Sequence, residues 1–171
     1  MSIFEMVTII LLLVLILSMV WMLTEFSSLK KDLGEVNPVK IDPEMRKLRL
    51  QAYERAALLT ERITLPNVLS RIPSAGLNAR QMQQALSDEI KQEFDYNISQ
   101  QIYLSPEIWK AITNMKEQNI YIVNQVGATL PAKANALDLN KQVVDFLINN
   151  PKTSIGEIVL EAINFEAKKL M

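Results

Sequence analysis

The sequence predicts an all-α protein with one N-terminal transmembrane helix followed by a compact bundle of about five helices. Residues 6–23 read MVTIILLLVLILSMVWML, and no charge lies between Glu5 and Glu25. As a helix this stretch spans about 27 Å, close to the ~30 Å hydrocarbon core of a bilayer. Further along, apolar residues recur three or four positions apart, which is the period of an amphipathic helix. No stretch is typical of a strand hairpin, and no repeat of about 20–50 residues occurs.

The first segment is interpreted as an uncleaved anchor rather than a signal peptide. Residues 1–5 contain no Lys or Arg, and no small-residue cleavage site follows Trp21. Lys30, Lys31 and Lys40 follow the apolar stretch. By the positive-inside rule, these residues predict an N-terminus outside and the remaining chain in the cytoplasm. We therefore expect a single-pass protein of the inner membrane.

The expected organisation is an anchor over 1–29, a linker over 30–41 and a cytoplasmic helical domain over 42–171. Gly34 and Pro38 mark the linker as non-helical. At its end, Asp42-Pro43-Glu44 predicts a helix start, because the three residues suit the cap, the first turn and the positive dipole end. This helix should run to about residue 63. Its expected buried stripe comprises Met45, Leu48, Ala52, Ala56, Leu59 and Ile63.

The next helix should be capped by Asn78 and run from residue 79 to about 103, after a connection with a short helical turn or packed loop at 68–72. Its core positions follow in four-residue steps: Met82, Leu86, Ile90, Phe94, Ile98 and Ile102. The same helix carries an acidic group of Asp88, Glu89, Glu93 and Asp95. We interpret this group as a solvated face, since a di-metal carboxylate site on helices normally adds His ligands.

Ser105-Pro106-Glu107 is the clearest cap in the chain and should start a helix that runs to about Leu130. Two further helices are expected over 136–149 and 155–170, with Ser154 as the cap of the last one.

The composition excludes much of the common enzyme repertoire. The chain has 0 Cys and 0 His, so it has no thiol nucleophile, disulfide or imidazole base. Its 4 Gly are not clustered, so no glycine-rich phosphate loop is present. We expect no enzyme, no catalytic residue, no cofactor and no metal. An enzyme would have to rely on carboxylates such as Glu93 and Asp95, or on Lys and Tyr.

The charges are balanced overall but unevenly placed. Lys and Arg number 18 and Asp and Glu 19, which gives no reason to expect nucleic-acid binding. Residues 30–80 hold ten basic and six acidic residues. Basic side chains beside the anchor are either a solvated face or contacts to the membrane surface. The candidate contacts are Lys30, Lys31, Lys40, Arg46, Lys47 and Arg49.

Several helical motifs lie between Leu48 and Trp109. They are Leu50-Gln51-Ala52-Tyr53-Glu54-Arg55, Leu58, Glu61-Arg62-Ile63, Gln83-Gln84-Ala85-Leu86, Ile90, Glu93-Phe94, Asn97, Ser99-Gln100-Gln101-Ile102-Tyr103, Ser105 and Trp109. With these motifs the stretch resembles an uncharacterised family of small bacterial single-pass membrane proteins. The resemblance implies an N-terminal anchor and a helical cytoplasmic part, and it brings no activity and no site residues.

The functional hypothesis is a membrane-anchored structural or adaptor subunit whose helical cytoplasmic domain docks onto a membrane-associated complex. The expected partners are the lipid bilayer and either another protein or further copies of the chain, with no nucleic acid. The alternative is a lipid-surface module that uses the basic helix 46–62.

Overall fold

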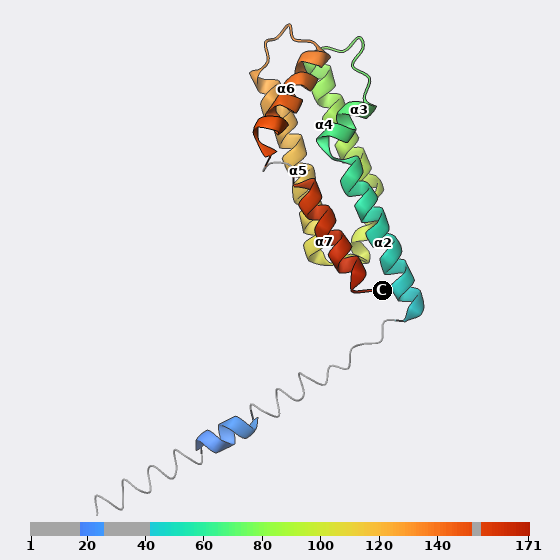
Figure 1. The fold of residues 1–171 in the computed structure, drawn as a ribbon, viewed down its shortest axis with the longest axis vertical. Coiled ribbons are helices and arrows are strands. Elements are labelled where there is room, and N and C mark those ends of the chain that lie inside the picture. Colours follow the sequence, from blue (N-terminus) through green and yellow to red (C-terminus); the bar gives the residue numbers. More distant parts are fainter. Residues whose placement is uncertain (1–17, 26–41, 152–154) are drawn as a thin grey trace, which may run out of the picture. The chain divides into compact units, whose positions relative to one another are not determined.

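The computed structural model describes residues 18–25, 42–151 and 155–171. The chain divides into two units, Met1–Asp42 and Pro43–Met171. In the first unit, residues 18–25 are helical and their side chains are exposed. The second unit contains the bundle of helices labelled in Figure 1.

The predicted transmembrane helix needs correction. Within the described ranges, no helix is both long enough and apolar enough to cross a membrane. Residues 18–25 rise only about 12 Å, against the ~30 Å of a bilayer core. Residues 6–17, the rest of the predicted span, lie outside the described residues. The predicted fold class was therefore wrong in its transmembrane helix. The single-pass inner-membrane localisation and the orientation derived from that helix are likewise not supported.

The all-α class is confirmed for the described part of the chain. The second unit consists of α2 (Pro43–Arg62), α3 (Leu65–Arg71), α4 (Ala79–Tyr96), the 3-10 helix η1 (Ile98–Ile102), α5 (Pro106–Thr129), α6 (Ala136–Asn149) and α7 (Gly156–Lys168). Local sequence explains the helix starts. The Ser105 side chain accepts a hydrogen bond from the Ile108 amide at 3.4 Å, and Pro106 occupies the first turn. The predicted cap at Ser105 is thereby confirmed.

Helix α5 packs against α4, α6 and α7. Helix α2 packs mainly on α7, and α4 packs on α5 and α6. The fully buried side chains come from most of these helices and include Leu59, Ile63, Met82, Leu86, Ile112, Leu139 and Ile163. Burying each large aliphatic side chain contributes about 1.5–3 kcal/mol. The core therefore joins segments that are far apart in the sequence.

The starts of α4 and α6 are joined to each other. Asn78 and Asn135 each form a capping box, with Gln81 and Asp138 respectively. The two caps also pair as an isolated antiparallel β-bridge. The Ala79 amide donates to the Ala134 carbonyl at 3.0 Å. The cap predicted at Asn78 is confirmed, whereas the second box and the bridge were not predicted.

The helix predicted over residues 79–103 ends earlier, at Tyr96. Asn97 follows it with φ −104° and ψ 7°, and its side chain donates back to the Glu93 carbonyl at 2.9 Å. The chain then continues as η1. Because the helix phase is lost at Asn97, Ile98 and Ile102 are 47% and 75% exposed instead of buried.

The first turns of α2 also differ from the prediction. Ala52, Ala56 and the later stripe positions are buried, but Met45 and Leu48 are exposed. In Figure 1, α2 begins beyond the end of its neighbour α7, so these turns have less protein to pack against.

Candidate functional site

A groove lies between α2 and α7, with a volume of about 640 Å³. Its lining residues from α2 include Leu50, Tyr53 and Ala57, and those from α7 include Ile163 and Ala167. The small alanine side chains leave the space between the two helices unfilled. The groove therefore presents an apolar surface to solvent.

Tyr53 lies beneath this surface and supports it. Its side chain is only 1% exposed, and its hydroxyl accepts a hydrogen bond from the Ser105 amide at 3.3 Å. The ring is thus held between the groove and the start of α5. A side chain held in this way loses little conformational freedom when a partner binds.

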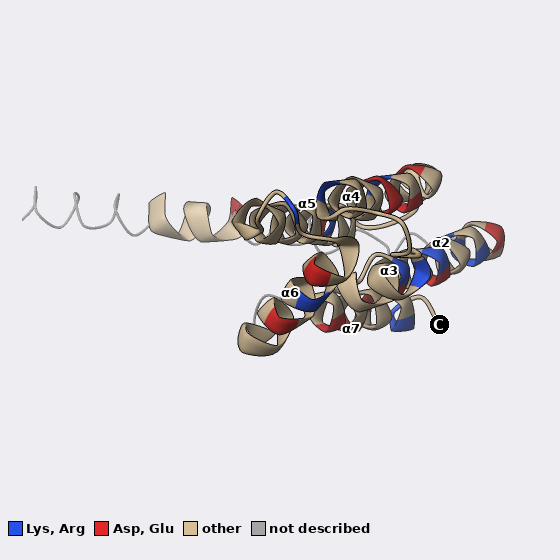
Figure 2. Cartoon of the chain, turned by 90° about the horizontal axis from the view of Figure 1, so that it is seen from above, with Lys and Arg blue, Asp and Glu red and all other residues tan. Residues whose placement is uncertain are grey.

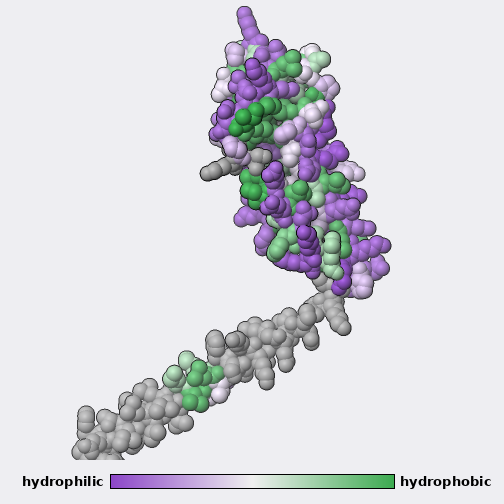
Figure 3. All heavy atoms as spheres, in the orientation of Figure 1, coloured by the Kyte–Doolittle hydropathy of each residue, from purple (hydrophilic) through white to green (hydrophobic). Residues whose placement is uncertain are grey.

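Exposed apolar side chains occur along both helices that form the groove. Leu58 is 58% exposed and lines the groove from α2. Met171 lines it at the C-terminal end of the chain, and Phe165 is 63% exposed on α7. Figure 3 is drawn in the orientation of Figure 1 and shows hydrophobic residues at the surface between hydrophilic ones. Exposed apolar surface of this kind is typical of interaction sites.

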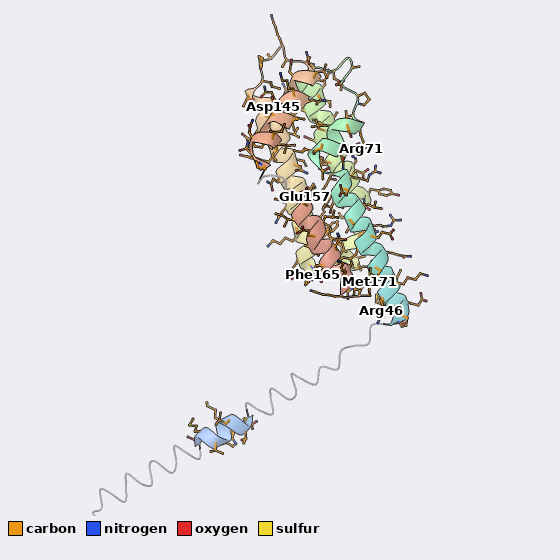
Figure 4. The ribbon with its side chains drawn as sticks, viewed as in Figure 1. Arg46, Arg71, Asp145, Glu157, Phe165 and Met171 are labelled. Atoms are coloured by element: carbon orange, nitrogen blue, oxygen red, sulfur yellow. The ribbon has the colours of Figure 1, made fainter. Side chains whose placement is uncertain are left out.

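Charged side chains border the groove, and the two signs are separated along it. On α2, one stripe contains Lys47, Glu54, Leu58 and Glu61 at helical spacing, and the first three of these line the groove. On α7, the stripe that passes through the lining residue Asn164 contains Glu157, Glu161 and Lys168. Figure 4 shows Arg46 and Met171 at one end of the α2–α7 pair and Glu157 at the other end of α7. Basic residues therefore line one end of the groove, Glu54 lies along its α2 wall, and Glu61 and Glu157 lie on the same two helices beyond the lining residues at the other end.

A second, more polar groove of about 740 Å³ lies between α2 and the end of α4. In it Arg62 pairs with Glu93 at 2.5 Å, and nearby Arg71 pairs with Glu89 at 2.9 Å. The hydrogen bond that Arg62 donates to the Glu93 carboxylate, and then the negative charge of Glu93, raise the pKa of Arg62 above its ordinary value. Figure 2 shows the basic positions on α2 and the acidic positions on α4 that such pairs join. These charges hold α2 and α3 against α4 and are not free for a ligand.

The structure describes three of the six basic residues predicted as membrane-surface contacts. Arg46 and Lys47 are exposed in the first turns of α2 and line the α2–α7 groove. Arg49 is half-buried, and its Nε donates to the Tyr103 carbonyl at 3.3 Å. The other three predicted contacts, Lys30, Lys31 and Lys40, lie outside the described residues.

The sequence reasoning missed the groove itself. Leu58 lies outside the buried stripe through Ala52, Ala56 and Leu59. Its position on the helix could therefore have indicated that its side chain faces outward. Nothing in the sequence showed that Ala57 and Ala167 would face a common hollow, because they are 110 positions apart.

The acidic residues do not combine into a metal centre in the part of the chain that the structure describes, where no cluster of three or more His, Cys, Asp or Glu could hold an ion. Chemically, the α2–α7 groove can desolvate an apolar side chain against Leu50, Ala57 and Leu58, with the charged lining residues Arg46, Lys47 and Glu54 beside them.

The family comparison agrees with the coarse resemblance seen in the sequence. The model of a family of unknown function, DUF7935, matches residues 1–170. No curated protein and no solved structure was found to match. The chain belongs to this family of unknown function.

Proposed function

We propose that this protein is a helical adaptor or structural subunit that docks onto a protein partner through the α2–α7 groove. The observation that supports this function is the apolar lining of the groove, in which Leu50, Ala57 and Leu58 reach the surface over the buried Tyr53 and Ile163. Covering such a surface removes apolar area from water, at about 25 cal/mol per Å². We also propose that the protein is bacterial, as the resemblance over Leu48–Trp109 implies.

The placement of the charges favours docking over catalysis. Arg46, Lys47 and Glu54 are exposed and stand beside the apolar floor. Catalytic acids and bases usually sit where burial and close neighbours shift their pKa values. A charged rim around an apolar centre is instead the anatomy of a protein interface.

The alternative, a lipid-surface module built on helix 46–62, is supported less well. Its arginines point to different sides of α2. Arg49 contacts the backbone of Tyr103, Arg62 pairs with Glu93, and Arg55 lines the α2–α4 groove. A membrane surface attracts basic residues most strongly when they face it together.

The test uses the full chain with a C-terminal tag, purified at native expression in mild detergent. Wild type is compared with Leu58→Asp in the groove and with Leu137→Asp on α6, a matched leucine that is 65% exposed. We expect mass spectrometry to identify a protein that copurifies with wild type and with Leu137→Asp but is lost from Leu58→Asp. A protein that runs alone, or a partner that both variants retain, would refute the proposal. Binding of anionic vesicles that weakens with salt would favour the lipid alternative.

A further inference from the structure

We infer that the occupant of the α2–α7 groove is an amphipathic α-helix of a partner protein, with acidic residues at its N-terminal end and basic residues at its C-terminal end. This inference rests on the proposed function and adds the chemistry and the direction of the partner.

The shape of the groove suits a helix. Its two walls are the neighbouring helices α2 and α7, and a third helix can lie in the furrow between two others. On α2, the stripe from Lys47 to Glu61 covers 15 residues, and its ends lie about 21 Å apart along the helix, which matches about four turns of a docked partner. The apolar lining residues of α2 run from Leu50 to Leu58, about 12 Å of helix, and this length fits side chains at positions i, i+3, i+4 and i+7 of an amphipathic helix.

The rim charges specify what the partner carries at each end. Arg46 and Lys47 line the basic end, with Lys168 next to the lining residue Ala167, and beyond the other end lie Glu61 on α2 and Glu157 on α7. None of these five side chains forms an ion pair with another residue in the described ranges. They are therefore available to pair with a partner. Complementary charges also exclude a partner docked in the wrong direction.

The direction follows from the electrostatics of helices. A helix is stabilised by acidic residues in its first turn and basic residues in its last turn. A partner with that pattern matches the groove when its N-terminus lies beside Lys47 and Lys168 and its C-terminus lies beside Glu61 and Glu157. The docked helix then runs in the same direction as α2 and opposite to α7.

The binding test uses the full-length protein and two labelled peptides of about 18 residues. Both carry the same apolar stripe and the same composition. One has acids at the N-terminus and bases at the C-terminus, and the other has both signs mixed at each end. We expect fluorescence anisotropy at low salt to show about tenfold tighter binding of the first peptide, and this ratio should fall at high salt.

Groove variants provide the controls. Reversing the basic rim with Lys47→Glu and Lys168→Glu should abolish the preference, whereas Leu58→Asp should weaken both peptides and Leu137→Asp neither. All four positions are exposed, so circular dichroism should confirm that the variants fold as wild type does. A ratio unchanged by the charge reversal, or equal affinity for the two peptides, would overturn the inference.

The absence of cysteine from the chain allows the direction to be tested by disulfide trapping. A cysteine at the peptide N-terminus should cross-link to Met171→Cys at the basic end, and one at the peptide C-terminus should cross-link to Leu58→Cys. Equal trapping in both combinations, or trapping in the opposite pairs, contradicts the proposed direction.

These outcomes are distinct from failure of the proposed function. If a copurifying protein depends on Leu58 but neither peptide binds, the helix inference fails and the docking function stands. If the groove instead binds a second copy of this chain, detected as a dimer that Leu58→Asp dissociates, the inference is overturned.

Discussion

Replacing Asn119 with alanine should lower the free energy of unfolding by about 2 kcal/mol. The Asn119 side chain on α5 is 6% exposed, and its Nδ2 donates to the Ile63 carbonyl at 2.8 Å. Ile63 is fully buried and follows the last residue of α2. Carbonyl groups at a helix C-terminus have no partner within the helix. Alanine would leave this carbonyl buried without a donor, a loss of about 1–3 kcal/mol.

The expected shift in melting temperature follows from the size of the unit. The entropy of unfolding is roughly 2 cal/mol/K per residue, so a unit of about 130 residues loses about 7 °C for 2 kcal/mol. Chemical denaturation followed by far-UV circular dichroism measures the free energy directly. The matched control is Asn114→Ala, at an exposed position on the same helix, and it should change stability by less than about 0.5 kcal/mol.

A second variant separates the lost hydrogen bond from the lost volume. Asn119→Asp keeps the shape of the side chain but removes the donor and places a carboxylate near the Ile63 carbonyl. It should destabilise more than Asn119→Ala at neutral pH and recover when the carboxyl group is protonated. If Asn119→Ala costs no more than Asn114→Ala, the assigned role of this bond is refuted.

Three further variants test the packing and the charges by the same denaturation assay. Gly127→Ala alone should change stability little, because the ~1 kcal/mol gained in helix propensity is offset by displacing Gln83, whose Oε1 lies 2.5 Å from the new Cβ. In a Gln83→Ala background the same change should stabilise by about 1 kcal/mol, and the absence of any gain there would contradict the reasoning. Asn135→Ala should cost about 1 kcal/mol through loss of its capping box, and a neutral result would show that water replaces the cap. A double-mutant cycle with Arg62→Gln and Glu93→Gln should give a coupling below about 1 kcal/mol that weakens in salt, because the Arg62 side chain is 54% exposed. A larger coupling that persists in salt would mean that the pair is better shielded than its exposure indicates.

Local sequence signals predicted much of the bundle. The caps at Asn78 and Ser105 and the stripe through Met82, Leu86, Ile90 and Phe94 depend on neighbouring residues, so they could be identified without tertiary information. The end of α4 could not be predicted in this way. In the sequence, apolar residues continue at four-residue spacing through Ile98 and Ile102. In the structure, the helix ends before Asn97, whose side chain donates a hydrogen bond to the Glu93 carbonyl, and both isoleucines are exposed.

The candidate site depends on long-range pairing. Helices α2 and α7 are separated by most of the second unit, and only their packing brings Ala57 beside Ala167. The basic residues Arg46 and Lys47 were identified as surface contacts, but their position beside an apolar floor was not. Likewise, the acidic group on α4 was expected to be solvated, yet Glu89 and Glu93 pair with arginines of α3 and α2.

The β-bridge between the two caps has a consequence for local opening. The Ala79 amide donates to the Ala134 carbonyl, and the Ala136 amide donates to the Leu77 carbonyl at 3.1 Å. Amides in the first turn of a helix ordinarily exchange their hydrogens quickly with solvent, because they lack a partner within the helix. Here each loop supplies the acceptor for the other, so neither helix start can fray alone. The two amides should exchange slowly and at matching rates, as one cooperative unit built from segments 57 residues apart in the chain.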